Sequence, residues 1–386
     1  MVVVGVARTR AVRIRLTAVR AAVLIGLGLV PVVLIPLSLT VAEGRSFDFH
    51  AFWGAGRDVL AGRSPYPALD ALPAVADRLT FRPFVYPAPA AFLMAPFAAL
   101  PFWLANVLFA LATVAAIAGA LRLLGVRDWR CYGAAFISCP TVGAVGGGTV
   151  SPFLLLGAAA LWRYRRTWWS AGPLLAFLLV MKLFLWPLAA WFLATRRYGA
   201  TLAAATLTLA TTLGAWAAIG FAGLREYPAL LDRLTGLVGP NSFSSYALAL
   251  GLGAPAGATE LALKGLSAIA FCGLVWAGRR RLDERQAFLA CLAAALLLTP
   301  ILWPHYLVLL FVPIALASPR FSGLWLAPVI LVLEARPWSY GNPLRIVPML
   351  AIALFVFAKA SDVTGNVRRA PGPRSRGALG RPQSRR

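Results

Sequence analysis

The chain has 386 residues, of which 60% are hydrophobic and only 13% are charged. Soluble domains average about 45–50% apolar and about 25% charged residues, so this composition excludes an ordinary soluble globular protein. The net charge of +24 would suggest a nucleic-acid-binding protein if the chain were soluble, but the positions of the basic residues relative to a bilayer give a simpler explanation.

Apolar runs of span length recur between residues 21 and 358, so we expect an all-α, polytopic bundle of transmembrane helices. Basic residues collect in the short cytoplasmic loops of membrane proteins, so the chain crosses the membrane an even number of times between two such loops. The basic clusters then define these crossings: 21–41, 102–121, 131–146, 150–162, 168–180, 183–195, 199–222, 258–278, 286–302, 306–318, 321–335 and 344–358. This makes about twelve crossings, with both termini inside and 22 of the 24 net positive charges on the inner side.

The same pattern divides the chain into three parts. Residues 1–20 form a basic cytoplasmic tail, residues 21–358 form the transmembrane domain, and residues 359–386 form a second basic cytoplasmic tail that we expect to be disordered. The tails would lie against anionic lipid, which attracts each charge by about 1 kcal/mol near the surface. The longest outer loop spans residues 42–101, and its apolar stretch 87–100 is interpreted as re-entrant or interfacial.

Asp48 stands at the start of a predicted amphipathic helix in this outer loop. Phe49, Phe52 and Trp53 fall on one apolar stripe and Asp58 is turned away, so we expect the helix to lie along the outer membrane surface. Two interpretations of Asp48 remain open. It can cap the helix by accepting a backbone N–H, or it can face an outer cavity and take a proton from a hydroxyl.

Several predicted crossings have only about 13 to 16 residues, fewer than the ~20 that a full span needs. They meet in pairs at outer tips, at residues 146–149, 181–182 and 303–305. Non-helical backbone survives at membrane depth only where protein or water receives its polar groups. We therefore expect a cavity that opens toward the outside.

Lys182 and His305 stand at two of these tips. A charge in the apolar run around Lys182 costs roughly 2.5–3.5 kcal/mol, which favours a functional role, although the ammonium group could also snorkel to the outer interface. His305 has no neighbouring His or Cys, and the four cysteines lack CxxC spacing, so we expect no metal site. His305 is either a satisfied structural residue or a contact to a phosphate.

Further residues of the outer face could line the cavity. These candidates are Gly148, Thr149, Arg82, Tyr86, Asn241, Trp303 and Tyr306. The glycines at 146–148 either allow close packing or present backbone amides to an anion. Arg82, Tyr86 and Asn241 are otherwise ordinary loop residues.

Five features in this order resemble glycosyltransferase family 87. They are Asp48 followed by AGRSPYP, the stretch FVYPAPAAFLMAPFAALP, a Gly-rich tip before SPFLLLGAAAL, a Lys in the next hairpin, and TPILWPHYLVLL. The likeness spans roughly residues 40 to 318, and the order of the features carries it. Members of the family are integral membrane mannosyltransferases that use polyprenyl-phosphate-mannose. They have the C-type glycosyltransferase fold, with the active site on the outer face.

The resemblance implies that Asp48 is the catalytic base and that His305 contacts the donor phosphate, with Lys182 as a further cation in the cavity. It implies an inverting transfer of a sugar, expected to be mannose, to a glycolipid or polysaccharide on the outer face of the plasma membrane. The lipid-phosphate sugar is a co-substrate, and we expect no other cofactor, no metal and no nucleic acid.

A secondary transporter or flippase of a lipid-linked or anionic substrate is the alternative. It would also place a Lys, a His and broken helices at membrane depth. The chain shows no internal repeat, however, and alternating access does not require a long outer loop with an amphipathic helix.

Overall fold

A computed structural model of the chain describes residues 46–69, 83–331 and 338–369. Within these ranges every regular element is a helix, so the predicted all-α fold is confirmed. The predicted N-terminal tail (1–20), the first crossing (21–41), Arg82 and most of the C-terminal tail lie outside the described residues.

The described helices follow one another with short connections. Their bounds are α3 (Phe47–Leu60), α4 (Ala88–Ala98), α5 (Phe102–Leu123), α6 (Trp129–Ile137), α7 (Cys139–Gly147), α8 (Ser151–Tyr164), α9 (Trp168–Met181), η2 (Leu183–Leu185), α10 (Pro187–Ala194), α11 (Tyr198–Ala218), α12 (Tyr227–Val238), η3 (Gly239–Asn241), α13 (Ser245–Gly251), α14 (Ala256–Arg280), α15 (Glu284–Leu297), η4 (Pro304–Leu310), α16 (Phe311–Ala317), η5 (Gly323–Leu326), α17 (Ala327–Ile330) and α18 (Pro343–Arg369).

Four of the described helices are long and apolar enough to cross a membrane. They are Phe102–Leu123, Tyr198–Ala218, Ala256–Arg280 and Pro343–Asp362. Helices α7 and α8 together pass the same test but meet at 119°, which gives up to five spans by length and composition. The other predicted crossings fall on shorter or broken helices, so a membrane protein is supported while the count of about twelve crossings stays a prediction.

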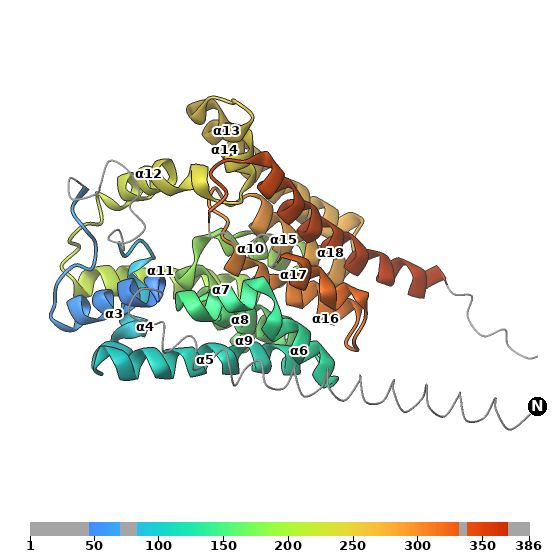
Figure 1. The fold of residues 1–386 in the computed structure, drawn as a ribbon, viewed down its shortest axis with the longest axis horizontal. Helices are drawn as coiled ribbons and strands as arrows, with labels where there is room; N and C mark the ends of the chain where they lie inside the picture. The colour runs from blue at the N-terminus through green and yellow to red at the C-terminus, as the bar shows by residue number, and fades with distance from the viewer. Residues whose placement is uncertain (1–45, 70–82, 332–337, 370–386) are drawn as a thin grey trace, which may run out of the picture.

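The helices form a bundle in which segments distant in sequence lie side by side (Figure 1). Helix α5 packs on α8, α9 packs on both α8 and α11, and α10 packs on α14 and α15. None of the residues of α14 is buried, although the helix is 25 residues long and mostly apolar. Such an exposed apolar surface is expected of a helix that faces lipid.

Helix α3 turns its apolar stripe toward protein, whereas the sequence suggested contact with lipid, and its place relative to the membrane surface stays a prediction. Its apolar stripe is buried in the protein, with Phe49 and Phe52 fully inaccessible. The ring of Phe49 stacks on Phe109 of α5 at 4.5 Å, and the ring of Phe52 lies 4.4 Å from that of Tyr86. An apolar stripe fits a protein core as well as a bilayer surface, and here α4 and α5 cover it.

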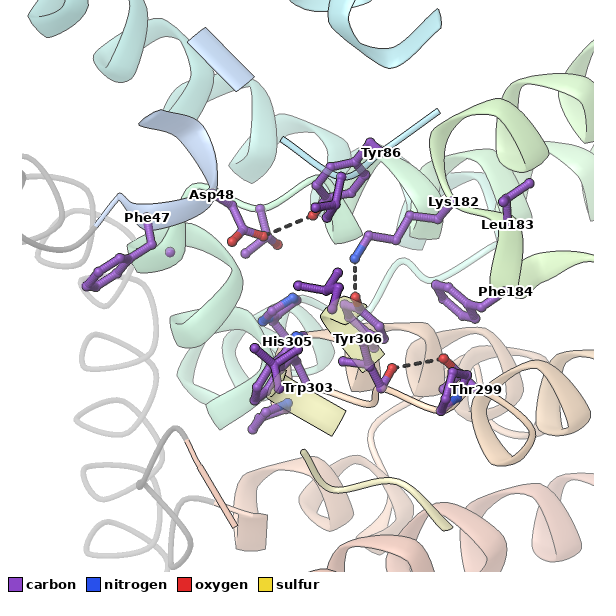
Figure 2. Close-up of a pocket in the computed structure, with 18 of the residues that line it drawn as sticks. Phe47, Asp48, Tyr86, Lys182, Leu183, Phe184, Thr299, Trp303, His305 and Tyr306 are labelled. Atoms are coloured by element: carbon purple, nitrogen blue, oxygen red, sulfur yellow. Dashed lines mark hydrogen bonds between the residues drawn. The ribbon is translucent and has the colours of Figure 1, made fainter. Parts of the chain in front are cut away.

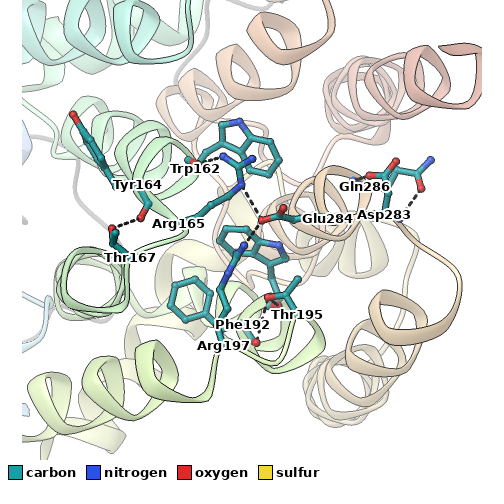
Figure 3. Close-up of polar contacts among 11 residues, drawn as sticks. Trp162, Tyr164, Arg165, Thr167, Phe192, Thr195, Arg197, Asp283, Glu284 and Gln286 are labelled. Carbon is teal, nitrogen blue, oxygen red and sulfur yellow. Dashed lines mark hydrogen bonds and ion pairs between the residues drawn. The ribbon is translucent and has the colours of Figure 1, made fainter. Parts of the chain in front are cut away.

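Different charged residues lie near the two ends of α9. Near its start, Arg165 and Arg197 both donate to Glu284 at the beginning of α15, as Figure 3 shows. Lys182 follows its last residue. A helix of 14 residues is about 21 Å long, so Lys182 lies far from that arginine cluster.

Candidate functional site

A cavity of about 950 Å³ lies between α3, α7 and α12 and the non-helical turns that precede η2 and η4. Asp48, Lys182 and His305, which are separated by more than 100 residues in sequence, all line it (Figure 2). Its volume is within the usual range of about 300–1,000 Å³ for small-molecule sites. The cavity therefore brings together the three charged or ionisable residues that the sequence singled out.

Asp48 lies in the first turn of α3, whose N-cap residue is Ser46. Its Oδ2 atom accepts a hydrogen bond from the Tyr86 hydroxyl at 3.2 Å. The interpretation of Asp48 as a helix cap is wrong, because α3 has no side-chain capping hydrogen bond and the carboxylate bonds to Tyr86 instead. Burial raises the pKa of Asp48 above its ordinary value, while the charge of Lys182 and the Tyr86 hydrogen bond act in the opposite direction.

Gly148 fixes the position of α3 against α7. It has a φ of +63°, and a Cβ placed on it would come within 2.6 Å of the Cβ of Phe49, the residue after Asp48. The backbone amides of Gly148 and Thr149 donate to the carbonyls of Val145 and Ala144, which close the end of α7. These amides therefore cannot receive an anion, and close packing is the role of the glycine.

Lys182 ends α9 because its backbone is extended, with φ −155° and ψ 118°. Its side chain is 8% exposed and donates to the Tyr306 hydroxyl inside the cavity. The ammonium nitrogen lies 3.8 Å from the centroid of the Tyr306 ring and 4.9 Å from that of Tyr86. The ammonium group is thus held over two aromatic rings, as cation–π attraction favours, and does not snorkel to the surface.

His305 follows Pro304 at the start of η4, and its ring meets that of Tyr306 at 4.8 Å in an edge-to-face arrangement. Its Nε2 atom is buried and has no hydrogen-bond partner among the described residues. A buried polar atom without a partner costs about 1–3 kcal/mol. An oxygen atom of a bound ligand would remove that cost.

The other predicted site residues divide into two groups. Tyr86, Thr149, Trp303 and Tyr306 line the cavity. Gly148 and Asn241 do not line it. Gly148 packs on α3, and the backbone carbonyl of Asn241 accepts a hydrogen bond from the backbone N–H of Ser339.

The sequence interpretation missed an apolar wall of the cavity. Tyr227, Leu231, Leu234 and Val238 line it from α12, and Phe184 does so from η2. Their spacing on α12 repeats every three or four residues, so a search for helical stripes in the loop 223–257 would have found them. Thr299 and Trp338 also line the cavity, and no local sequence pattern marks them.

The cavity combines acidic, basic and apolar side chains. A carboxylate, a buried ammonium group and an imidazole face one space whose remaining walls are mostly aromatic and aliphatic. No group of three or more His, Cys, Asp or Glu side chains that could hold a metal ion occurs in the part of the chain that the structure describes. The arrangement can abstract a proton at one side and stabilise a negative charge at the other.

The model of glycosyltransferase family 87 matches residues 84–313, more than half of the chain. The chain belongs to this family. The resemblance inferred from the sequence is therefore confirmed, and the protein is an enzyme, a membrane glycosyltransferase. The matched region contains Tyr86, Lys182 and His305, whereas Asp48 precedes it.

Two characterised relatives extend the match. The chain is 29% identical over 332 residues to the polyprenol-phosphate-mannose-dependent alpha-(1-2)-phosphatidylinositol pentamannoside mannosyltransferase of Mycolicibacterium smegmatis, covering 78% of this chain and 79% of that protein. It is also 29% identical over 289 residues to the protein of the same name from Mycobacterium tuberculosis, covering 68% of this chain and 66% of the relative. No solved structure matches the chain significantly.

Proposed function

We propose that this enzyme transfers mannose from polyprenyl-phosphate-mannose to a hydroxyl of a glycolipid on the outer face of the plasma membrane. The observation that carries the proposal is that one cavity holds the carboxylate of Asp48 and, from other helices, the cations or proton donors Lys182 and His305. Both relatives are named for this donor and for a mannosylated phosphatidylinositol acceptor, which supports mannose as the sugar and a glycolipid as the acceptor.

In this mechanism Asp48 is the general base. The acceptor hydroxyl oxygen attacks the anomeric carbon, the bond from that carbon to the phosphate oxygen breaks, and Asp48 takes the hydroxyl proton. The bonding electrons leave with polyprenyl phosphate. One displacement at the anomeric carbon inverts its configuration.

Lys182 and His305 would stabilise the phosphate as it gains charge. Preorganised cations and hydrogen-bond donors act strongly on charge that develops in a site shielded from water. His305 has a buried ring nitrogen without a partner in the described structure, which a phosphate oxygen could satisfy. Both His305 and the Lys182 ammonium group contact the ring of Tyr306. These groups would supply the charge stabilisation in the proposed reaction, and the proposal includes no metal ion or other cofactor.

The apolar wall suits the lipid part of the donor. Leu183 and Phe184 from η2 and Leu231 and Leu234 from α12 line the cavity beside Lys182. Leu183 is 50% exposed, so this wall continues to the surface of the protein. A prenyl chain could leave the cavity there and enter the bilayer while its phosphate stays at Lys182.

The direct test uses membranes that contain the protein and polyprenyl-phosphate-mannose with a radiolabelled sugar. We expect label to enter a glycolipid fraction, and NMR of the product to show the anomeric configuration opposite to that of the donor. An Asp48→Asn membrane preparation with equal protein content is the control. Transfer of label to the same degree by the control membranes, or label that crosses the membrane unchanged, would contradict the proposal.

A further inference from the structure

Tyr86 is the only described residue whose side chain donates a hydrogen bond to the carboxylate of Asp48. It comes from the segment before α4, not from the helix that carries Asp48. Figure 2 shows the two side chains pointing toward each other, with Lys182 beside the tyrosine ring. The bond occupies Oδ2 and so fixes which carboxylate oxygen remains for a substrate.

Contacts with neighbouring residues also restrict the position of Tyr86. Its backbone carbonyl accepts a hydrogen bond from the Tyr66 hydroxyl at 2.9 Å, and its ring packs on Phe52 of α3 at 4.4 Å. Pro87 follows directly and restricts the backbone conformation of Tyr86. These contacts leave the side chain little freedom, which is what a group that orients another residue requires.

We propose that Tyr86 is a positioning residue for the transfer reaction, whose hydroxyl holds Oδ2 of Asp48 so that Oδ1 faces the acceptor hydroxyl. This inference rests on the proposed function. Tyr86 does not exchange a proton with the substrate; it acts through Asp48. A group that orients a base changes the rate of the chemical step, because a misplacement of about 1 Å at a reacting atom can cost about 100-fold.

The hydrogen bond also bears on the protonation of the base. Besides Asp48, six ionisable side chains line the cavity: Tyr86, Cys139, Lys182, Tyr227, His305 and Tyr306. Tyr86 is the one that bonds to the carboxylate, and a bond to the charged form lowers the pKa of Asp48. Loss of the hydroxyl should therefore raise that pKa and move the acidic limb of the rate profile to higher pH.

The test is Tyr86→Phe, which keeps the ring under Lys182 and removes only the hydroxyl. We expect kcat to fall about 10- to 100-fold, KM for donor and acceptor to stay close to wild type, and the acidic limb of kcat/KM to move to higher pH. Tyr132→Phe is the matched control, because it also removes one tyrosine hydroxyl that donates to a backbone carbonyl, that of Val126 at 3.0 Å, and Tyr132 does not line the cavity. It should change neither kcat nor the pH profile.

A second pair of measurements separates positioning from folding. In an Asp48→Asn background, Tyr86→Phe should cause little further loss, because two residues that act as one unit are not additive. Replacing Tyr86 by 3-fluorotyrosine keeps the fold and makes the hydroxyl a stronger donor, so the acidic limb should move to lower pH. This second variant decides the question even if Tyr86→Phe fails to fold.

The inference is overturned if the wild-type enzyme transfers mannose and both Tyr86 variants keep its kcat and pH profile. It is also overturned if Tyr86→Phe loses as much activity in the Asp48→Asn background as in the wild type. Absence of mannose transfer by the wild-type enzyme is a different result, and it would count against the proposed function itself.

Discussion

The substitution Asp48→Asn tests the base most directly. Asparagine has the shape of aspartate, and its amide oxygen can still accept the hydrogen bond that Tyr86 donates to Asp48 at 3.2 Å in the wild-type protein. It cannot take a proton. Because Asp48 is not the cap of α3, the substitution also removes no capping hydrogen bond.

Two magnitudes show why the result will be clear. Loss of a general base typically costs ~10²–10⁴ in rate. Replacing the charged acceptor by a neutral one changes the free energy of unfolding by only about 1–2 kcal/mol, to which the loss of the charge opposite Lys182 adds. The variant should therefore be produced in a folded form, bind the donor and fail to transfer mannose.

The assay measures the initial rate of transfer of labelled mannose by purified protein in lipid nanodiscs, with donor binding measured separately. Asp58→Asn on the same helix is the control. Asp58 pairs with Arg63 at 2.6 Å on the exposed side, and such surface pairs contribute about 0.2–1 kcal/mol to stability. The control should transfer at a rate near wild type. If Asp48→Asn also does so, the base must be sought elsewhere in the cavity.

Three further predictions concern the donor, the pH dependence and the topology. His305→Ala and Lys182→Ala should each raise KM for the lipid-phosphate donor and lower kcat, with His305→Ala the more damaging; unchanged donor kinetics in both folded variants would remove their role. Since burial raises the pKa of the proposed base, the transfer rate should fall as pH drops through a value above the ~4 of an exposed aspartate, and an acidic midpoint at or below 4 would contradict this. Cysteines introduced at Ser64 and Gly341 should react with an impermeant thiol reagent in intact cells, whereas one at Ser375 should not; the reverse pattern would place the cavity inside.

The sequence predicted the ionisable residues of the candidate site better than the contacts that surround them. Lys182 and His305 were predicted as cavity residues because an ionisable residue stands out where it interrupts an apolar segment. The bounds of α5 (Phe102–Leu123) and α14 (Ala256–Arg280) also lie within a few residues of the predicted crossings, because both are continuous apolar runs.

What the sequence could not supply depends on contacts between distant segments. The stripe of Phe49 and Phe52 has the same period whether it meets lipid or protein, so its burial under α4 and α5 had no local signal. The hydrogen bond from Tyr86 to Asp48 joins residues 38 positions apart. Nothing in either segment alone specifies that their side chains meet.

The opposite charges of Asp48 and Lys182 in one cavity have a consequence for the proposed transfer. Each charge alone would be costly in this cavity, but the two are opposite in sign, so each reduces the cost of the other. When the donor is bound, its phosphate competes with the carboxylate for the positive charge of Lys182. As the bond to the anomeric carbon breaks, the phosphate gains negative charge, which raises the pKa of Asp48 by repulsion. In the proposed reaction the carboxylate would therefore become a stronger base at the stage in which the acceptor hydroxyl must lose its proton, and Lys182 would couple departure of the phosphate to proton abstraction.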